Sequence, residues 1–241
     1  MIRGIDWCPN TSNDPLLAIT DMNGHVYLSN YDGSNILRVV FSQRCTICTK
    51  IEIPAVCWFR GGIILKTTFC QIRYFKKEPK TNIWRKLWYI KSINKPYILI
   101  AHPSKNWLFY YTLEGYLMQM IFPEDEGTIP TIHTYLYHGY KYHFVDFLHP
   151  WCHHLAVTDD LKELSILESY SGSEVSKVEL DIEGDISALV SHPNDPLIVV
   201  VSDCGEMIIL GITDPEQPMI LAHFCLQRKP LNLIKFSHSG K

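Results

Sequence analysis

Histidine is the residue type in this 241-residue chain that most suggests chemistry, because imidazole binds metals and transfers protons near neutral pH. Six of the eleven histidines fall within a short stretch, namely His133, His138, His143, His149, His153 and His154. Adjacent side chains of a strand point to opposite faces, so His153 and His154 cannot both enter one site. His149 occupies a turn position that recurs at His102 and His192, which favours a structural role. We expect no metal site.

The cysteines suggest two further kinds of chemistry, zinc binding and disulfide exchange. The one Cys-x-x-Cys pair is Cys45 and Cys48, with Cys57 nine residues beyond it. A zinc site needs a second close pair of cysteines or histidines, and none follows. A redox motif needs a following helix, whereas the residues here are typical of a strand. We therefore expect free thiols in a reducing compartment rather than a disulfide framework.

Catalytic signatures are also missing from the sequence. It contains no phosphate-binding loop, no Gly-x-Ser-x-Gly nucleophile turn and no His-Glu-x-x-His zinc motif. Asp159 and Asp160 fall where a hairpin turn is expected, a position that favours aspartate for its turn geometry. These observations predict a protein without catalytic residues, cofactor or small-molecule substrate, and an enzyme is the least favoured functional class.

The composition is that of an ordinary folded protein. Apolar residues make up 46% of the chain and charged residues 20%, and the formal net charge is −3. This balance excludes extensive disorder and provides no overall field that recruits nucleic acid or a membrane. The longest apolar runs, such as residues 196–201, are far shorter than the roughly 18 residues of a membrane span. Residues 1–6 lack the apolar core of a signal peptide, so we expect a soluble chain that is not secreted.

Charge is unevenly distributed along the chain. Residues 66–95 contain nine basic residues and one acidic residue, a net +8, whereas residues 159–185 contain nine acidic and two basic residues, a net −7. Aromatic residues are interleaved with the basic ones, and the centre of the first stretch is a hairpin tip at residues 76–82. The stretch is either a solvated outer hairpin whose aromatic side chains face inward or a docking site for an acidic partner. The candidate docking residues are Arg73, Lys76, Lys77, Lys80, Trp84, Arg85 and Lys86.

A repeat of about 46 residues indicates which elements position these segments. A short apolar strand followed by a His-Pro turn, or by a similar turn, occurs six times, for example at residues 99–103 and 189–193. The copies end at residues 9, 60, 103, 150, 193 and 239, so their spacings are 51, 43, 47, 43 and 46 residues. A sustained period of this length is the signature of a repeat architecture.

A second landmark, a tight turn, lies about a dozen residues after the end of each of the first five copies. The structural turn residues are Asn23, Gly24, Gly115 and Gly205, residue types that tolerate a positive φ. The second and fourth copies have residues 68–71 and 159–162 at this place, without glycine. Apolar strands on both sides of the turns give four short strands per repeat. Four strands in roughly 40–45 residues predict a β-propeller blade, and a β-sandwich with evenly spaced strands is the alternative.

The order of strand, His-Pro turn, strand, Asx-Gly turn and strand resembles the WD40 repeat over essentially the whole chain. The terminal Trp-Asp pair of that family is absent, because residues 29–30 are Ser-Asn and residues 211–212 are Gly-Ile at the corresponding places. No Gly-His precedes the first strands at the family's distance. The blades are therefore divergent, and the side-chain hydrogen-bond network of regular WD40 blades is not expected in them.

Divergent blades with His-Pro turns, best seen in residues 14–28 and 191–197, are similar to the propellers of cilia- and flagella-associated WD-repeat proteins of the axonemal tether or tether-head class. This resemblance implies a non-catalytic structural role in the axoneme, in dynein-arm tethering and cilium motility. The implied partners are proteins such as tubulin, whose tails are acidic, or dynein-associated subunits. Single-stranded nucleic acid is the rival ligand for the basic stretch. The alternative function is a cytoplasmic propeller adaptor, either a substrate receptor or a nucleic-acid-associated scaffold.

The expected fold is all-β, a single WD40-like propeller segment over residues 1–241 with about five blades and the first strand of a sixth. The expected blades cover residues 1–50, 51–95, 96–140, 141–183 and 184–229, with a partial blade at 230–241. Because the sixth copy stops after one strand, we expect an incomplete ring and a fragment or short isoform of a longer chain. The alternative is a five-bladed ring in which the last segment adds the outer strand of the first blade.

Overall fold

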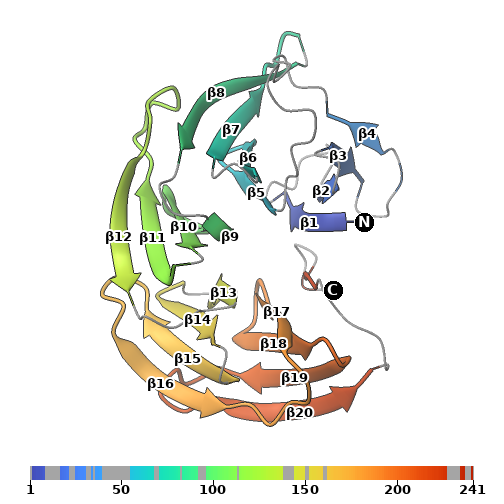
Figure 1. Ribbon diagram of the computed structural model, residues 1–241, viewed down its shortest axis with the longest axis vertical. Coiled ribbons are helices and arrows are strands. Elements are labelled where there is room, and N and C mark those ends of the chain that lie inside the picture. The colour runs from blue at the N-terminus through green and yellow to red at the C-terminus, as the bar shows by residue number, and fades with distance from the viewer. Residues whose placement is uncertain are drawn as a thin grey trace. The chain divides into compact units, whose positions relative to one another are not determined.

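In the computed structural model, every regular element of the described part of the chain is a β-strand (Figure 1). The structure describes residues 2–8, 17–21, 25–30, 34, 36–39, 55–67, 71–81, 83–91, 96–112, 114–137, 144–149, 152–159, 162–226, 234–236 and 240. The strands form five sheets of four strands each, and in every sheet the hydrogen-bonded neighbours are consecutive in sequence. This arrangement confirms the prediction of an all-β fold with about five four-stranded blades.

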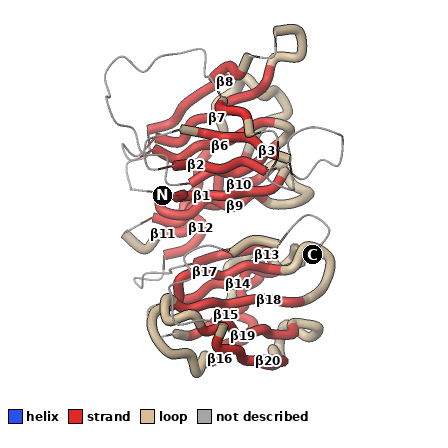
Figure 2. The backbone as a smooth tube through the Cα atoms, turned by 90° about the vertical axis from the view of Figure 1, so that its right-hand side faces the viewer, coloured by secondary structure: helices blue, strands red, loops and turns tan. Residues whose placement is uncertain are grey.

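The chain divides into two compact units. Unit 1 comprises residues 1–113 and 118–134, and unit 2 comprises residues 114–117 and 135–241. Within each unit the strands run roughly alongside one another across the view of Figure 2.

Sheets 1, 2 and 3 lie in unit 1, apart from short segments of sheet 3. Sheet 1 consists of β1 (Ile2–Trp7), β2 (Leu17–Asp21), β3 (Val26–Ser29) and β4 (Leu37–Arg38). Sheet 2 consists of β5 (Ala55–Phe59), β6 (Gly62–Thr67), β7 (Gln71–Lys77) and β8 (Trp84–Lys91). Sheet 3 consists of β9 (Pro96–Ala101), β10 (Trp107–Thr112), β11 (Tyr116–Ile121) and β12 (Thr131–Tyr137).

Sheets 4 and 5 lie in unit 2. Sheet 4 consists of β13 (Phe144–Phe147), β14 (His154–Thr158), β15 (Glu163–Glu168) and β16 (Glu174–Glu179). Sheet 5 consists of β17 (Ile186–Ser191), β18 (Leu197–Ser202), β19 (Glu206–Gly211) and β20 (Met219–Cys225).

Sheet 2 is buried on both faces, which requires apolar residues at successive positions of its strands. On β6, Ile63 and Leu65 join a hydrophobic cluster that contains Ala18 of sheet 1. The residue between them, Ile64, joins a second cluster that contains Leu108 of sheet 3. Because side chains of a strand alternate between faces, one uninterrupted apolar run supplies both clusters.

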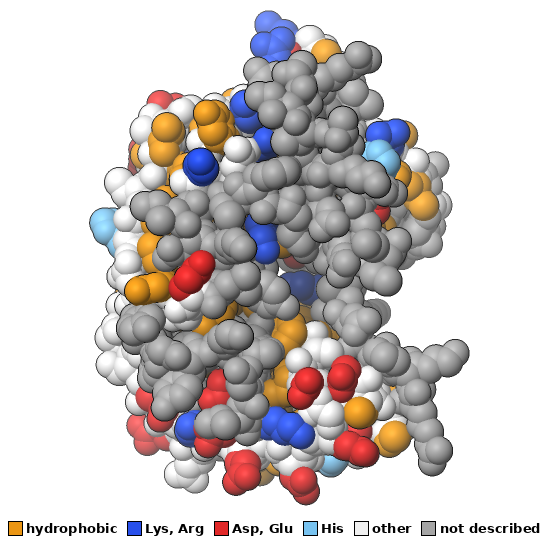
Figure 3. All heavy atoms as spheres, in the orientation of Figure 1, with side chains coloured by type: hydrophobic (Ala, Val, Ile, Leu, Met, Phe, Trp, Pro, Cys, Tyr) orange, Lys and Arg blue, Asp and Glu red, His pale blue; other side chains and the backbone are white. Residues whose placement is uncertain are grey.

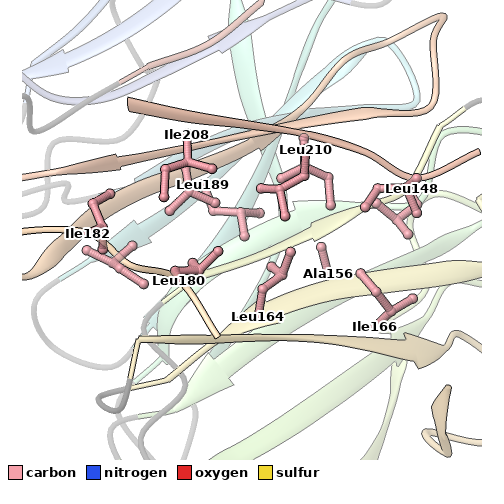
Figure 4. Close-up of a cluster of buried hydrophobic side chains, with 13 residues drawn as sticks. Leu148, Ala156, Leu164, Ile166, Leu180, Ile182, Leu189, Ile208 and Leu210 are labelled. Atoms are coloured by element: carbon pink, nitrogen blue, oxygen red, sulfur yellow. The ribbon is translucent and has the colours of Figure 1, made fainter. Parts of the chain in front are cut away.

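Sheets 4 and 5 pack face to face through a cluster of aliphatic side chains (Figure 4). Leu164 and Ile166 of β15 lie in it with Ile208 and Leu210 of β19, and all four are almost completely buried. Burying one such side chain stabilises the fold by about 1.5–3 kcal/mol. Unit 2 therefore has its own hydrophobic core.

The described part of the sixth repeat copy lies against the other face of sheet 5. Ile234 and Phe236 pack on the apolar cluster of β17 and β18, and the Phe236 ring centroid is 4.8 Å from that of His192. Residues 234–236 and 240 are in no strand, and the remainder of 230–241 lies outside the described residues. The partial sixth blade and the incomplete ring therefore stay predictions.

An aspartate on the first strand of a sheet accepts a hydrogen bond from the first strand of the next sheet. Asp6 Oδ2 lies 2.7 Å from the Trp58 backbone nitrogen, and Asp146 Oδ2 lies 2.9 Å from the Ser191 backbone nitrogen. The partners are 52 and 45 residues apart, close to one repeat. An ionised acceptor makes such bonds shorter and stronger than neutral ones. These bonds fix sheet 1 to sheet 2 and sheet 4 to sheet 5.

The recurring histidine shapes the turn after the first strand. In His102 and His192, Nδ1 accepts hydrogen bonds from the backbone N–H groups two and three residues later, at 2.9–3.3 Å. His192 Nε2 lies 3.1 Å from the Gly240 carbonyl oxygen, to which it donates. In the equivalent turn of sheet 4, His149 Nδ1 lies 3.5 Å from Cys152 Sγ. These contacts give the turn histidines a structural role.

Two of the predicted turn glycines lie in described turns. Gly115 and Gly205 have φ values of 90° and 86°, where a residue with a side chain is strained. Asn23 and Gly24 lie outside the described residues. In the fourth copy, whose turn lacks glycine, Lys162 adopts a φ of 61°, and its Nζ donates to a backbone carbonyl 20 residues later at 2.9 Å.

We expect Asp146→Ala to lower the free energy of unfolding by about 1–3 kcal/mol, because the N–H groups of Ser191 and Phe147 both lose their carboxylate acceptor. Chemical denaturation of the full chain, followed by fluorescence, measures the change. Asp181→Ala is the control, since it removes an exposed carboxylate that has no partner among the described residues. Equal losses for the two variants would contradict a linking role for Asp146.

Stability is expected to fall as the pH drops below about 6.5. Burial lowers the pKa of His149 and of His154, although the nearby Asp146 acts in the opposite direction on His149. Below about pH 6.5 the unfolded chain therefore binds protons on these side chains before the folded chain does, and unfolding becomes easier.

The test compares urea denaturation of the parent and of the His149→Gln/His154→Gln variant from pH 7 down to pH 5. The variant should lose less stability over this range. His133→Gln, at an exposed position, should keep the parent's pH dependence. Identical slopes for all three proteins would exclude the two half-buried histidines, His149 and His154, as the cause.

Candidate protein-docking surface

The predicted docking residues lie on the hairpin formed by β7 and β8, the last two strands of sheet 2. The antiparallel pairing places Arg73 opposite Tyr89 and Gln71 opposite Lys91. Closer to the tip it places Phe75 opposite Lys86 and Lys76 opposite Arg85. Between these two segments the register shifts by one residue, so Leu87 has no opposite partner. Side chains of opposite residues share a face of the sheet, so this register decides which predicted residues lie together.

The register shift sends the two tryptophans of β8 to opposite faces of the sheet. Trp84 lies in the cluster shared with sheet 1, and its ring centroid is 6.2 Å from that of Trp58. Trp88 lies in the cluster shared with sheet 3, with its ring centroid 5.4 Å from that of Tyr74. Trp84 is only 7% exposed. This predicted docking residue therefore belongs to the hydrophobic core rather than to the surface.

On one face of the hairpin the cations are paired with carboxylates of unit 1. Lys76 Nζ lies 2.5–2.6 Å from the two carboxylate oxygens of Glu126, in the loop between β11 and β12. Arg85 lies 3.1 Å from Glu78 at the hairpin tip. Exposed ion pairs contribute little to stability, but they neutralise the charge that a partner would meet. These two predicted residues are already engaged within the chain.

The opposite face of the hairpin gathers cations around an exposed tyrosine. Tyr89 is 52% exposed, and Lys86 Nζ lies 4.9 Å from the centroid of its ring. Arg73 stands opposite Tyr89 and donates two hydrogen bonds to Gln71 Oε1, at 2.7 and 3.0 Å. Lys91, two residues beyond Tyr89, is exposed. We call Arg73, Lys86, Tyr89 and Lys91 the cationic face.

The remaining predicted lysines lie at the hairpin tip. Lys77 and Lys80 are both exposed, and the Lys and Arg side chains at this end of the hairpin are visible in Figure 3. Within the described residues, no carboxylate lies at ion-pair distance from Lys77, Lys80, Lys86 or Lys91. The hairpin thus carries cations that are not neutralised by the described residues, and their field extends about 8–10 Å at physiological salt.

Two members of the cationic face, Tyr89 and Lys91, were not among the candidate docking residues. Both lie in the basic stretch, so composition points to their neighbourhood. What composition does not indicate is the register shift at Leu87, which places Lys86 and Tyr89 on the same face although they are three residues apart. An unbroken alternation would have placed them on opposite faces.

The described residues offer little support for a different kind of site. They contain no group of three or more His, Cys, Asp or Glu side chains that could hold a metal ion. They also contain no helix long and apolar enough to cross a membrane. The thiol of Cys152 faces His149, but burial raises its pKa to about 11, so the pair is a neutral thiol and imidazole rather than an activated nucleophile.

Comparison with solved structures shows what this architecture is similar to. The β-propeller domain of Cps50 (Swd1) from Myceliophteria thermophila superimposes with a TM-score of 0.70 at 11% identity, over 92% of this chain and 71% of that one. A chain of the mitotic checkpoint complex gives 0.70 at 10% identity, over 99% and 71%. Sqt1 from Saccharomyces cerevisiae gives 0.65 at 12% identity, over 94% and 63%. The sequence matches no protein-family model and no curated protein.

These likenesses define the class of protein. The five four-stranded sheets form a WD40-like β-propeller fold, as the repeat predicts. At identities of 10–12% the neighbours show the fold alone.

Proposed function

We propose that this chain is a non-catalytic protein-interaction scaffold that docks an acidic protein surface on the cationic face of the β7–β8 hairpin. The observation that carries the proposal is the grouping of Arg73, Lys86 and Lys91 around the half-exposed ring of Tyr89. Aromatic and arginine side chains are enriched at protein interfaces, where they combine apolar contact with hydrogen bonding.

The chemistry of this face suits carboxylates better than other ligands. Lysine and arginine steer an acidic partner toward the surface, and the tyrosine hydroxyl supplies a neutral donor beside them. Single-stranded nucleic acid is the second candidate, since an exposed tyrosine can stack on a base. The protein partner is favoured because the face exposes one aromatic ring, whereas single-strand binding normally uses a series of them.

The finer proposal places the scaffold in the ciliary axoneme, as a component of dynein-arm tethering that contributes to cilium motility. It is supported by the similarity of the divergent His-Pro blades to cilia-associated WD-repeat proteins. The cationic face would then contact the acidic tails of tubulin or a dynein-associated subunit. A cytoplasmic adaptor is the alternative.

Reversing one charge on the cationic face tests the docking. Co-sedimentation with microtubules should weaken about tenfold for Lys91→Glu, and its salt dependence should become shallower, because the variant replaces an attraction with a repulsion. Lys105→Glu is the matched control, since it makes the same charge change at another exposed lysine of unit 1.

Equal binding by the two variants would remove the cationic face as the docking site. Microtubules whose acidic tails have been removed should bind the parent protein and the Lys91→Glu variant with equal affinity. The nucleic-acid alternative would be favoured if the parent protein bound a single-stranded RNA more tightly than it bound microtubules, and if Lys91→Glu lost this RNA binding.

The axonemal location has its own test. In ciliated cells extracted with detergent, we expect the protein in the axonemal pellet and its release by high salt. Quantitative recovery in the soluble fraction, equal in cells that lack cilia, would support the cytoplasmic adaptor instead.

A further inference from the structure

The last strand of sheet 5, β20, exposes apolar side chains along its whole length. Met219, Ile220, Leu221 and Phe224 are 61%, 48%, 54% and 45% exposed, and Leu226, just beyond the strand, is 50% exposed. Apolar residues exposed singly are ordinary, but a continuous run of them marks an interaction surface. This surface lies in unit 2 and involves no residue of the cationic face.

β20 is also a sheet edge. It pairs with β19 on one side, and no described strand pairs with its other side (Figure 1). Its outward backbone N–H and C=O groups form a row that can bind another extended chain. Folded proteins usually protect such an edge with charged residues, proline or a very short strand.

Three of the four equivalent edge strands of this chain are protected in those ways. β4 has only two residues. β8 carries Arg85, Lys86 and Lys91, and β16 carries Glu174, Lys177 and Glu179. β12 also lacks charged residues and proline, but the exposed side chains among its described ones are the polar Thr131, His133 and Thr134. β20, with the sequence Met-Ile-Leu-Ala-His-Phe-Cys, contains no Asp, Glu, Lys, Arg or Pro. β20 combines this lack of charge and proline with four exposed apolar side chains, those of Met219, Ile220, Leu221 and Phe224, and this combination indicates an edge that is open to a partner.

Carboxylates lie near both ends of β20. Asp214 and Glu216 are exposed in the loop that leads into the strand. At the other end, Glu206 pairs with Cys225 across the sheet, and its carboxylate is engaged within the chain: it accepts the Glu183 N–H at 2.8 Å and lies 3.2 Å from His223 Nε2.

The stretch that leads into this edge strand and includes it is acidic. Residues 162–226 contain twelve acidic and two basic residues, a net −10. Figure 3 shows Asp and Glu side chains gathered over sheets 4 and 5. Because Arg228 and Lys229 follow β20 closely in the sequence, the excess of negative charge is expected at the Met219 end of the strand, next to Asp214 and Glu216.

We propose that β20 is a docking edge for an extended segment of a partner protein, with an apolar centre and Lys or Arg residues at the end that lies next to Asp214 and Glu216. The open edge supplies main-chain hydrogen bonds to an added strand, the exposed side chains contact its apolar centre, and the carboxylates of Asp214 and Glu216 bind its basic end. A second copy of this chain is disfavoured as the occupant, because pairing two β20 strands would bring two surfaces of the same negative charge together.

The test uses fluorescence anisotropy of the full chain with labelled synthetic peptides. The probe has a centre of alternating valine and threonine between paired lysines. A second peptide has the same centre between paired glutamates, and a third has lysines at its ends and a proline in its centre. We expect the first peptide to bind and the other two to bind at least about tenfold more weakly, through repulsion and through the loss of strand pairing respectively.

Variants of the chain locate the binding. Met219→Lys places a charge on the edge and should weaken binding of the first peptide about tenfold. Ile129→Lys is the matched control, since Ile129 is 60% exposed in unit 1 and Met219 is 61% exposed. Glu216→Gln should weaken binding less, and it should flatten the salt dependence. Both exposed substitutions are expected to leave the melting temperature unchanged, which separates lost binding from lost folding.

Amide hydrogen exchange identifies the binding mode. Addition of the first peptide should slow exchange in residues 219–225, where new main-chain hydrogen bonds form. Binding without slowed exchange there would overturn strand addition. Equal affinity for the lysine-ended and glutamate-ended peptides would also overturn the proposal. So would an equal loss of peptide affinity in Met219→Lys and Ile129→Lys. Self-association of the chain that Met219→Lys abolishes would show that a second copy occupies the edge, which would overturn it as well.

The docking edge at β20 and the proposed function can be tested independently of each other. Lys91→Glu should leave peptide binding at β20 unchanged, and Met219→Lys should leave binding of the acidic partner unchanged. Loss of either activity in both variants would mean that one common surface accounts for both observations.

Discussion

Burial of both faces of each four-stranded sheet is the interaction on which the rest of this structure depends. A sheet such as the one formed by β5 to β8 has apolar side chains on both sides, so it is stable only between two neighbours. The alternation of Ile63, Ile64 and Leu65 between two clusters shows how closely the sequence meets this requirement. The aspartates that join first strands then align sheets that hydrophobic contact alone would leave free to slide.

The repeat could be recognised in the sequence because its recurring turn residues hold each sheet in the shape that this packing needs. His102 and His192 recur at one spacing since each holds the same turn, and Gly115 and Gly205 recur since each turn needs a positive φ. The docking residues were less predictable. Trp84 and Lys86 lie two residues apart on the same face of β8, yet Trp84 is 7% exposed and belongs to the core. Lys86 shares a face with Tyr89 only because the register shifts by one residue at Leu87. A shift of one residue in the register of a strand pair moves the side chains beyond it to the other face, so the faces of β8 could not be assigned by alternation alone.

The surfaces suited to binding lie on the last strands of their sheets. In unit 1, β8 combines a buried tryptophan with cations around Tyr89. In unit 2, β20 combines an open edge with apolar side chains and nearby carboxylates. First strands are constrained by aspartate bonds and by two packed faces. Fourth strands have fewer neighbours, so their residues can change in character without loss of the core.

The spacing of the aspartate bonds also has a mechanical consequence. Asp146 and Ser191 are 45 residues apart, so the chain between them is held as one loop closed by a single carboxylate contact and the packing around it. Fully extended, 45 residues span roughly 150 Å. If tension on the chain opened that contact and the sheet behind it, the contour would lengthen by about this amount in one step. A chain of such sheets would therefore yield to force in discrete increments, each close to one repeat in length.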